Sequence, residues 1–317
     1  MPRDGRLERH ADLAQSAPNP MPSSHPLPPR RSAKIGPPPP APTRPTVPAR
    51  AATPPEIPHP THYAVSGAWL CHTGKVRRVN EDSCLAGTIL SGGSAEVPAA
   101  IRMATSPWIV AVSDGIGGHR AGAEASQAVV SALAACKRIT PNGVADILHR
   151  LNRQLCERGK KDRDCAAMGA TIAGLGCGGR GLFAFHVGDS RIYRQEGDAL
   201  VQITRDDSEA EDLIDQGLLQ RSEGKRPGFL HALTQAIGGR EEAEEIDVHL
   251  LPLRVTGRTR FIVCSDGLTD MLHEPEIEGI LRAERAAASA VAALFAGAME
   301  AGGRDNITIA VVDVEPV

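Results

Sequence analysis

Three short apolar runs along the chain end in the same way, in a small residue and an aspartate with a glycine beside them. Runs this short that stop at turn residues predict buried strands. Two shorter runs flank Glu-Gly-Asp and predict a hairpin, and an apolar run close to residue 310 predicts a closing strand. The predicted strands are residues 108–113, 182–187, 191–193, 199–203, 260–265 and 307–314.

Helical composition marks four further stretches, residues 121–139, 144–158, 276–285 and 286–301. Strands and helices therefore mix without the regular alternation that a doubly wound parallel sheet requires. This mixture favours a layered sandwich of sheets and helices.

The first 60 residues follow a different pattern, because they hold 18 of the 25 prolines, including the run Pro37–Pro40. Proline-rich sequence lacks backbone donors and apolar mass, so it predicts a disordered tail with polyproline II character. The tail is interpreted either as a tether or as a docking ligand for a proline-recognising partner. Residues 61–317 are predicted to form the folded domain.

Charge and cysteine content narrow the class of protein. The formal net charge of -3 does not indicate a nucleic-acid binder. Seven cysteines without a C-x-x-C pair indicate free thiols in a reducing compartment. The sequence shows neither an apolar leader nor a stretch long enough to span a bilayer. We therefore expect a cytoplasmic monomer that binds neither nucleic acid nor membrane.

The aspartates that follow the three runs are candidates for a shared site. They are Asp114, Asp189 and Asp266, with Asp305 before the closing strand and a cluster at residues 80–82. Carboxylates that meet in one place repel one another unless cations neutralise them. All-oxygen ligands favour Mg²⁺ or Mn²⁺, with Ca²⁺ as a competitor. Each Asp-Gly pair taken alone is also an ordinary turn signal, so the metal hypothesis depends on their occurring together.

Seven motifs in order resemble the metal-dependent protein phosphatases of type 2C, in their bacterial branch. The resemblance covers about residues 63–317 and implies an α+β fold, a four-layer αββα sandwich of two antiparallel sheets flanked by helices. The motifs are Gly74–Asp82 (G-x-x-R-x-x-N-E-D), Asp114–His119 (D-G-x-G-G-H), Met168–Thr171 (M-G-A-T), Val187–Arg191 (V-G-D-S-R), Leu233–Gly239 (L-T-x-A-I-G-G), Ser265–Leu268 (S-D-G-L) and Gly303–Thr308 (G-x-D-N-x-T).

The resemblance also implies roles for individual residues around two Mn²⁺ or Mg²⁺ ions, with a possible third. Asp114 bridges the two central metals. The other implied metal ligands are Glu81 and the carbonyl of Gly115 for the second ion, Asp266 and Asp305 for the first, and Asp189 with Asp266 for the third. Asp82 is expected to orient metal-bound water, and Asn306 to be a turn or supporting residue.

The implied reaction is hydrolysis of phosphoserine or phosphothreonine by a hydroxide that bridges the two metals. Arg77 is the candidate for holding the phosphate, because its planar fork can bind two phosphoryl oxygens. Eukaryotic relatives have a histidine where this chain has Ile116, which cannot donate a proton. His119 and metal-bound water are the remaining candidates for the proton donor, and His119 is also interpreted as a helix-entry residue.

Some polar residues between the motifs receive structural interpretations. Residues 205–228 are expected to form a flap beside the cleft, as in the family. Asp206 and Asp207 are interpreted as a helix cap or a solvated pair rather than as a metal site. His186 is expected to be a core or hydrogen-bonded histidine, and Cys264 a small buried side chain.

The expected partners are phosphorylated proteins, among them a cognate Ser/Thr kinase and its substrates. An alternative is a catalytically weak, phosphatase-like regulatory module. The intact set of Arg77, Glu81, Asp114, Asp266 and Asp305 argues against that alternative. A calcium-binding structural domain predicts EF-hand or nonapeptide repeats, and neither pattern occurs.

Overall fold

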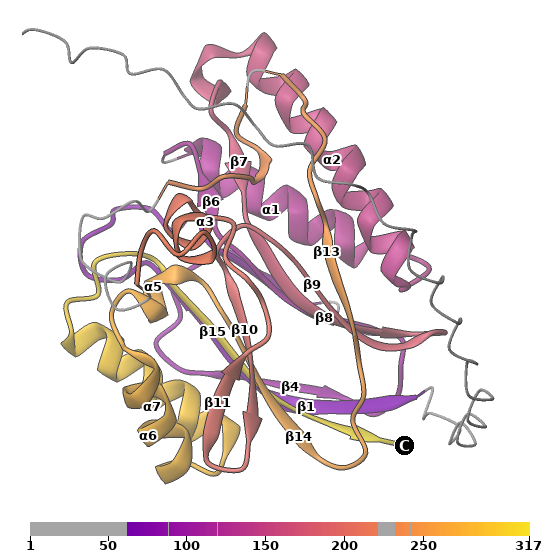
Figure 1. Cartoon of the computed structure of the whole chain (residues 1–317), viewed down its shortest axis with the longest axis vertical. Helices are drawn as coiled ribbons and strands as arrows, with labels where there is room; N and C mark the ends of the chain where they lie inside the picture. Colours follow the sequence, from indigo (N-terminus) through magenta and orange to yellow (C-terminus); the bar gives the residue numbers. More distant parts are fainter. Residues whose placement is uncertain (1–61, 88, 119, 221–231, 241) are drawn as a thin grey trace, which may run out of the picture. The chain divides into compact units, whose positions relative to one another are not determined.

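Two antiparallel sheets form the centre of the structure, a computed structural model that describes residues 62–317 apart from 88, 119, 221–231 and 241. The predicted tail, residues 1–60, lies outside the described residues, as does His119. The first six-stranded sheet of the described chain has the order β11 (Ala199–Gln202), β10 (Arg191–Glu196), β14 (Thr259–Cys264), β15 (Ile307–Pro316), β1 (Tyr63–His72) and β4 (Ala99–Met103) (Figure 1). The second has the order β13 (His249–Leu253), β9 (Gly181–Val187), β8 (Ile172–Gly178), β5 (Trp108–Ser113), β2 (Ser83–Ala86) and β3 (Ile89–Ser91).

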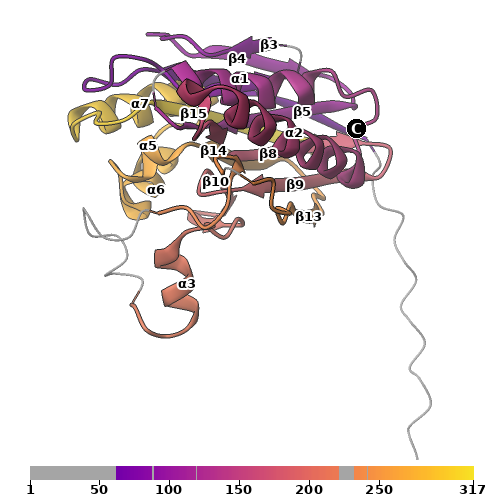
Figure 2. The same cartoon turned by 90° about the horizontal axis from the view of Figure 1, so that it is seen from above.

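Helices cover the outer face of each sheet, so that the described domain has four layers (Figure 2). One apolar cluster fills the space between the sheets, where Trp108 and Phe261 are buried. A second joins the β5 sheet to two helices, and a third joins the β15 sheet to two others. These helices are α1 (Arg120–Ala134) and α2 (Pro141–Lys161) on one side, and α6 (Glu274–Ala283) and α7 (Ala287–Glu300) on the other. The predicted αββα sandwich is confirmed.

Predicted and observed elements agree closely where apolar runs are continuous. The run at 108–113 is β5, and the predicted hairpin is β10 paired with β11. The first predicted helix is too long, because α1 ends at Ala134 and the chain turns at Ala135–Cys136. Strands β1 and β8 were not predicted. No helix in the described residues is long and apolar enough to cross a membrane.

Three short strands and one helical turn bring the motif residues together. A small sheet of β12 (Ile237–Gly238), β7 (Gly169–Ala170) and β6 (Gly115–Ile116) lies next to the end of β5. The amide of Thr171 donates to the carbonyl of Asp114 at 2.8 Å, which fixes the turn after β5. Helix α5 (Asp266–Thr269) begins directly after β14, so Asp266 starts a helix rather than only a turn.

Candidate active site

The carboxyl groups of Asp82, Asp114 and Asp266 lie close together, although their segments are far apart in the sequence. The carboxyl of Asp114 interacts with those of both Asp82 and Asp266. Asp189 adds a further negative charge beside Asp114 and Asp266. The aspartates that follow the three predicted strands therefore do meet in one site.

Burial and mutual repulsion disfavour the charged forms of these groups. Burial, followed by the charges of Asp82, Asp266 and Asp189, raises the pKa of Asp114 well above its ordinary value. The pKa of Asp266 is also raised well above that value by burial and by neighbouring carboxylates. Burial raises the pKa of Asp82 to about 6 and that of Asp189 to about 7. A bound cation would reverse this balance, because an opposite charge favours the ionised form.

Two oxygens of the cluster have no hydrogen-bond partner. The buried Oδ1 atoms of Asp82 and Asp266 are the only carboxylate oxygens in the described part of the chain with this property. A buried polar atom left unpaired costs on the order of 1–3 kcal/mol, and more if it is charged. The site therefore fits a cation, which takes such oxygens as ligands.

Hydrogen bonds fix the carboxylate of Asp82 through one of its oxygens, Oδ2, and leave the other, Oδ1, without a hydrogen bond. Its Oδ2 accepts from the hydroxyl of Ser265 at 2.8 Å and from that of Thr308 at 2.7 Å. The side chain is almost fully buried. This position is compatible with the expected role of orienting water, because the carboxylate cannot turn away.

Glu81 lies against two glycines, Gly115 and Gly122. A Cβ at Gly122 would stand 2.0 Å from Oε2 of Glu81 and 2.9 Å from the carbonyl oxygen of Gly115. The Gly115 amide donates to the Glu81 carbonyl at 3.1 Å. Only a residue without a side chain leaves room for the Glu81 carboxylate beside the Gly115 carbonyl. These are the two ligands expected for the second metal.

Asn306 joins the two ends of the domain at this site. Its Oδ1 accepts from the amide of Glu81 at 2.8 Å, and its Nδ2 donates to the carbonyls of Thr73 and Val79. The side chain therefore closes the loop that carries Arg77. The expectation of a turn or supporting residue is confirmed, and its partners are residues that no local pattern indicated.

Arg77 extends from this loop toward the carboxylates. One guanidinium nitrogen donates to Oδ2 of Asp305 at 2.6 Å, and 51% of the side chain is exposed. The charges of Glu81 and Asp114 also contribute to raising the pKa of Arg77, after the bond to Asp305 and its charge. The guanidinium is thus aimed by one carboxylate while its remaining donors can reach an incoming anion.

The surroundings of Asp189 contain carboxylates that sequence reasoning missed. Asp270, one helical turn after Asp266, raises the pKa of both Asp189 and Asp266. The i, i+4 spacing of Asp266 and Asp270 could have indicated this. Asp206 also raises the pKa of Asp189, whereas Arg191 lowers it.

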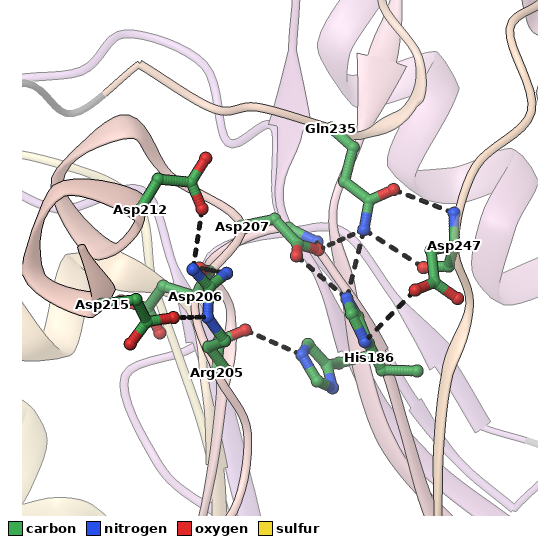
Figure 3. A network of polar contacts seen from close by, with 10 residues as sticks. His186, Arg205, Asp206, Asp207, Asp212, Asp215, Gln235 and Asp247 are labelled. Atoms are coloured by element: carbon green, nitrogen blue, oxygen red, sulfur yellow. Dashed lines mark hydrogen bonds and ion pairs between the residues drawn. The ribbon is translucent and has the colours of Figure 1, made fainter. Parts of the chain in front are cut away.

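The interpretation of Asp206 and Asp207 as a helix cap or solvated pair is wrong. Both are buried, and the cap of α3 (Glu209–Asp215) is Ser208. Asp206 forms an ion pair with Arg191. Asp207 accepts hydrogen bonds inside a polar network, which Figure 3 shows beside the ion pairs of Arg205. Helix α3 lies within the segment predicted as a flap and stands apart from the layers (Figure 2), whereas residues 221–228 of that segment lie outside the described residues.

Two details beside the carboxylates bear on the chemistry. Ile116 follows Gly115 in β6 and offers no proton, and the other side-chain candidate, His119, lies outside the described residues. A pocket of about 620 Å³ opens next to Asp82, with Arg120, Glu124 and Arg158 in its lining.

The chain is similar to known proteins of one family. A model of the protein phosphatase 2C family matches residues 99–305. The chain belongs to the protein phosphatase 2C family. It is 32% identical over 248 residues to the serine/threonine protein phosphatase PstP of Mycobacterium tuberculosis, over 76% of this chain and 43% of that protein. The chain thus spans less than half the length of this relative.

A shorter relative and a solved structure agree with this assignment. The serine/threonine phosphatase stp of Listeria welshimeri is 31% identical over 214 residues, which cover 65% of this chain and 84% of that protein. A crystal structure of the PstP catalytic domain in complex with two manganese ions matches with a TM-score of 0.65 and 28% identity. The match covers 80% of this chain and 99% of that chain.

Substitution of Gly122 by alanine tests the position of Glu81. We expect Gly122→Ala to weaken Mn²⁺ binding, because the new methyl displaces the Glu81 carboxylate and also presses on the Gly115 carbonyl, 2.9 Å away, so both expected ligands shift. Calorimetric titration measures Mn²⁺ binding, and circular dichroism measures the fold. The matched control is Gly279→Ala in α6, where a Cβ meets nothing within 4 Å and helix propensity improves by up to about 1 kcal/mol. Equal Mn²⁺ affinity in both variants would contradict this placement.

The raised pKa values of these carboxyl groups predict how the free energy of unfolding of the metal-free protein depends on pH. Between about pH 4 and pH 7 the folded chain keeps protons on these carboxyls that the unfolded chain has released, so their contribution to stability falls as pH rises. Mn²⁺ replaces the protons, so the increase in Tm on adding Mn²⁺ should grow from pH 5 to pH 8. Melting curves in chelator and in Mn²⁺ measure this. Asp189→Asn should flatten the metal-free profile, and an identical profile in both proteins would refute the assignment.

Proposed function

We propose that this chain is a metal-dependent protein phosphatase that hydrolyses phosphoserine and phosphothreonine in other proteins. The observation that carries the proposal is the carboxylate cluster, with unpaired oxygens on Asp82 and Asp266 and a guanidinium at its edge. Membership of the family supports it, as do relatives that bear the name of serine/threonine phosphatases.

The residues fit a centre for two Mn²⁺ or Mg²⁺ ions. Asp114 would bridge them, Asp266 and Asp305 would hold one, and Glu81 with the Gly115 carbonyl the other, while Asp189 would serve a third. Bound divalent ions supply a hydroxide near neutral pH and neutralise phosphoryl charge. The two manganese ions in the structure of the PstP catalytic domain support this choice of metal.

The chain's own groups then position the substrate. Arg77 would bind two phosphoryl oxygens with the donors that Asp305 does not occupy, and its exposure lets a protein substrate reach it. Asp82, fixed by Ser265 and Thr308, would accept a hydrogen bond from the attacking water and so orient it.

The remaining features of the proposal concern context. We place the protein in the cytoplasm as a monomer, with a cognate Ser/Thr kinase and its substrates as partners. Residues 61–317 would be the catalytic domain, with a flap at about 205–228, and residues 1–60 a disordered tail. The seven cysteines remain reduced among the described residues, which agrees with a reducing compartment.

Hydrolysis of a phosphothreonine peptide tests the proposal. We expect turnover with Mn²⁺ or Mg²⁺ that chelator abolishes. Asp266→Asn should lower kcat on the order of 100-fold or more, because metal charge stabilisation is worth several kcal/mol. Melting curves with and without Mn²⁺ confirm that the variant folds. Absence of metal-dependent turnover in the parent would overturn the proposal, and peptide binding without turnover would favour the regulatory module.

The phosphate-binding role has its own test. Arg77→Ala should lower kcat/KM about 10- to 100-fold, since hydrogen bonds to a charged group contribute roughly 1.5–3 kcal/mol. Mn²⁺ affinity should stay nearly the same, because the arginine is not a ligand. The neighbouring Arg78→Ala is the matched control and should leave kcat/KM within about twofold. Unaltered kinetics in Arg77→Ala would exclude the role.

A further inference from the structure

A pair of histidines faces each other across two neighbouring strands, β9 and β13. The register of β9 and β13 places His186 directly opposite His249. Residues directly opposite in an antiparallel pair share one face of the sheet. The two rings stack accordingly, with centroids 4.4 Å apart and 17° between their planes.

A carboxylate completes a group of three. Asp207, from the segment before α3, lies with Oδ1 2.9 Å from Nε2 of His249. One ligand atom from each of His186, Asp207 and His249 lies within 4.8 Å of the others. All three side chains come from separate segments.

Hydrogen bonds from neighbouring groups orient these side chains, as such bonds commonly orient the ligands of a metal ion. Nε2 of His186 lies 2.8 Å from the carbonyl of Arg205, which can only accept, so this nitrogen holds a proton and Nδ1 keeps its lone pair. Figure 3 shows this contact and the Asp207 carboxylate, whose Oδ2 accepts from Gln235 and from the Gly188 amide. The other side of His249 faces the carboxylate of Asp247 at 3.9 Å.

The group suits a different ion from the carboxylate centre. Two imidazoles and one carboxylate are a ligand set for Zn²⁺ and its neighbours Co²⁺ and Ni²⁺, whereas oxygen-only sites select Mg²⁺ and Mn²⁺. His186 is buried, and burial lowers its pKa, which favours the neutral ligand form. Two nitrogen ligands of tetrahedral Zn²⁺ lie roughly 3.3 Å apart and their in-plane lone pairs converge on the ion, so the stacked rings must rotate to bind it.

We propose that His186, His249 and Asp207 form a second metal site that takes one Zn²⁺-class ion, separate from the oxygen-lined centre. The ion would tie β9 and β13 to the segment that leads into α3. The site also adjoins the turn that carries Asp189, because the amide of Gly188 donates to Asp207 and the amide of Asp207 donates back to the Gly188 carbonyl. The bound ion would therefore stiffen the base of the predicted flap.

X-ray absorption at the zinc edge tests the ligands directly. The full chain without an affinity tag is stripped with chelator, and one equivalent of Zn²⁺ is added in excess Mg²⁺. The same measurement is made on Asp266→Asn, because that substitution weakens the oxygen-lined centre as a competitor for Zn²⁺. We expect the absorption spectrum of the Asp266→Asn protein to show two imidazoles in the ligand shell of the zinc ion. An oxygen-only shell in that protein overturns the proposal, and the result does not depend on catalysis.

Calorimetric titration with Zn²⁺ assigns the imidazoles. His186→Gln and His249→Gln should each lose Zn²⁺ affinity by about tenfold or more, and Gln235→Ala by about tenfold through lost orientation. His149→Gln on α2 is the matched control and should bind as the parent does. A purely structural role predicts that the first two variants melt earlier in chelator yet bind Zn²⁺ unchanged, and that outcome overturns the proposal.

Discussion

Repulsion between like charges is the constraint around which this domain is arranged. Asp82 and Asp266 each raise the pKa of Asp114, and Asp189 raises those of Asp114 and Asp266, so the folded chain holds groups together that would separate if they were free. Rigid elements resist that separation: Asp114 directly follows β5, and Asp266 begins α5 directly after β14. The apolar clusters between and outside the sheets provide the stability that offsets the strain of the site. Cations convert the repulsion into attraction, which makes metal binding and local order one event.

Sequence patterns predicted the strands that are continuous apolar runs, but not those that depend on a partner. Strand β8 has glycine at 174 and 176, where no apolar pattern can be seen. The register places these glycines opposite Phe185 and Phe183, and a Cβ at either would come within 2.5 Å of a ring atom. The strand is therefore completed by aromatic rings from β9, a relation that one segment alone cannot reveal. Motif resemblance supplied the layered architecture that periodicity left open.

The candidate site shows the same division. Residues within motifs, such as Arg77 and Asp114, were predicted from the resemblance to the family, whereas the groups that hold them were not. Asn306 bonds to Glu81 across 225 positions of sequence, and Asp207 becomes buried only because β9 and the segment after β11 lie side by side. Exposure of a charged pair cannot be inferred from local polarity when its partner is distant. The histidine pair likewise exists only through the register of β9 and β13.

The position of β15 has a consequence for the folding of the protein during translation. This strand lies between β1 and β14 in the sheet, and it delivers Thr308 to Asp82 while Asn306, just before it, closes the Arg77 loop. On the ribosome, β1 emerges early, and its sheet neighbour β15 is synthesised only after almost the whole of the described domain. Until residues 305–316 have emerged, the site lacks Asp305 and the side chains of Asn306 and Thr308 that fix the Arg77 loop and Asp82. Translation must therefore pass Thr308 before Asp82 and the Arg77 loop gain the contacts that fix them.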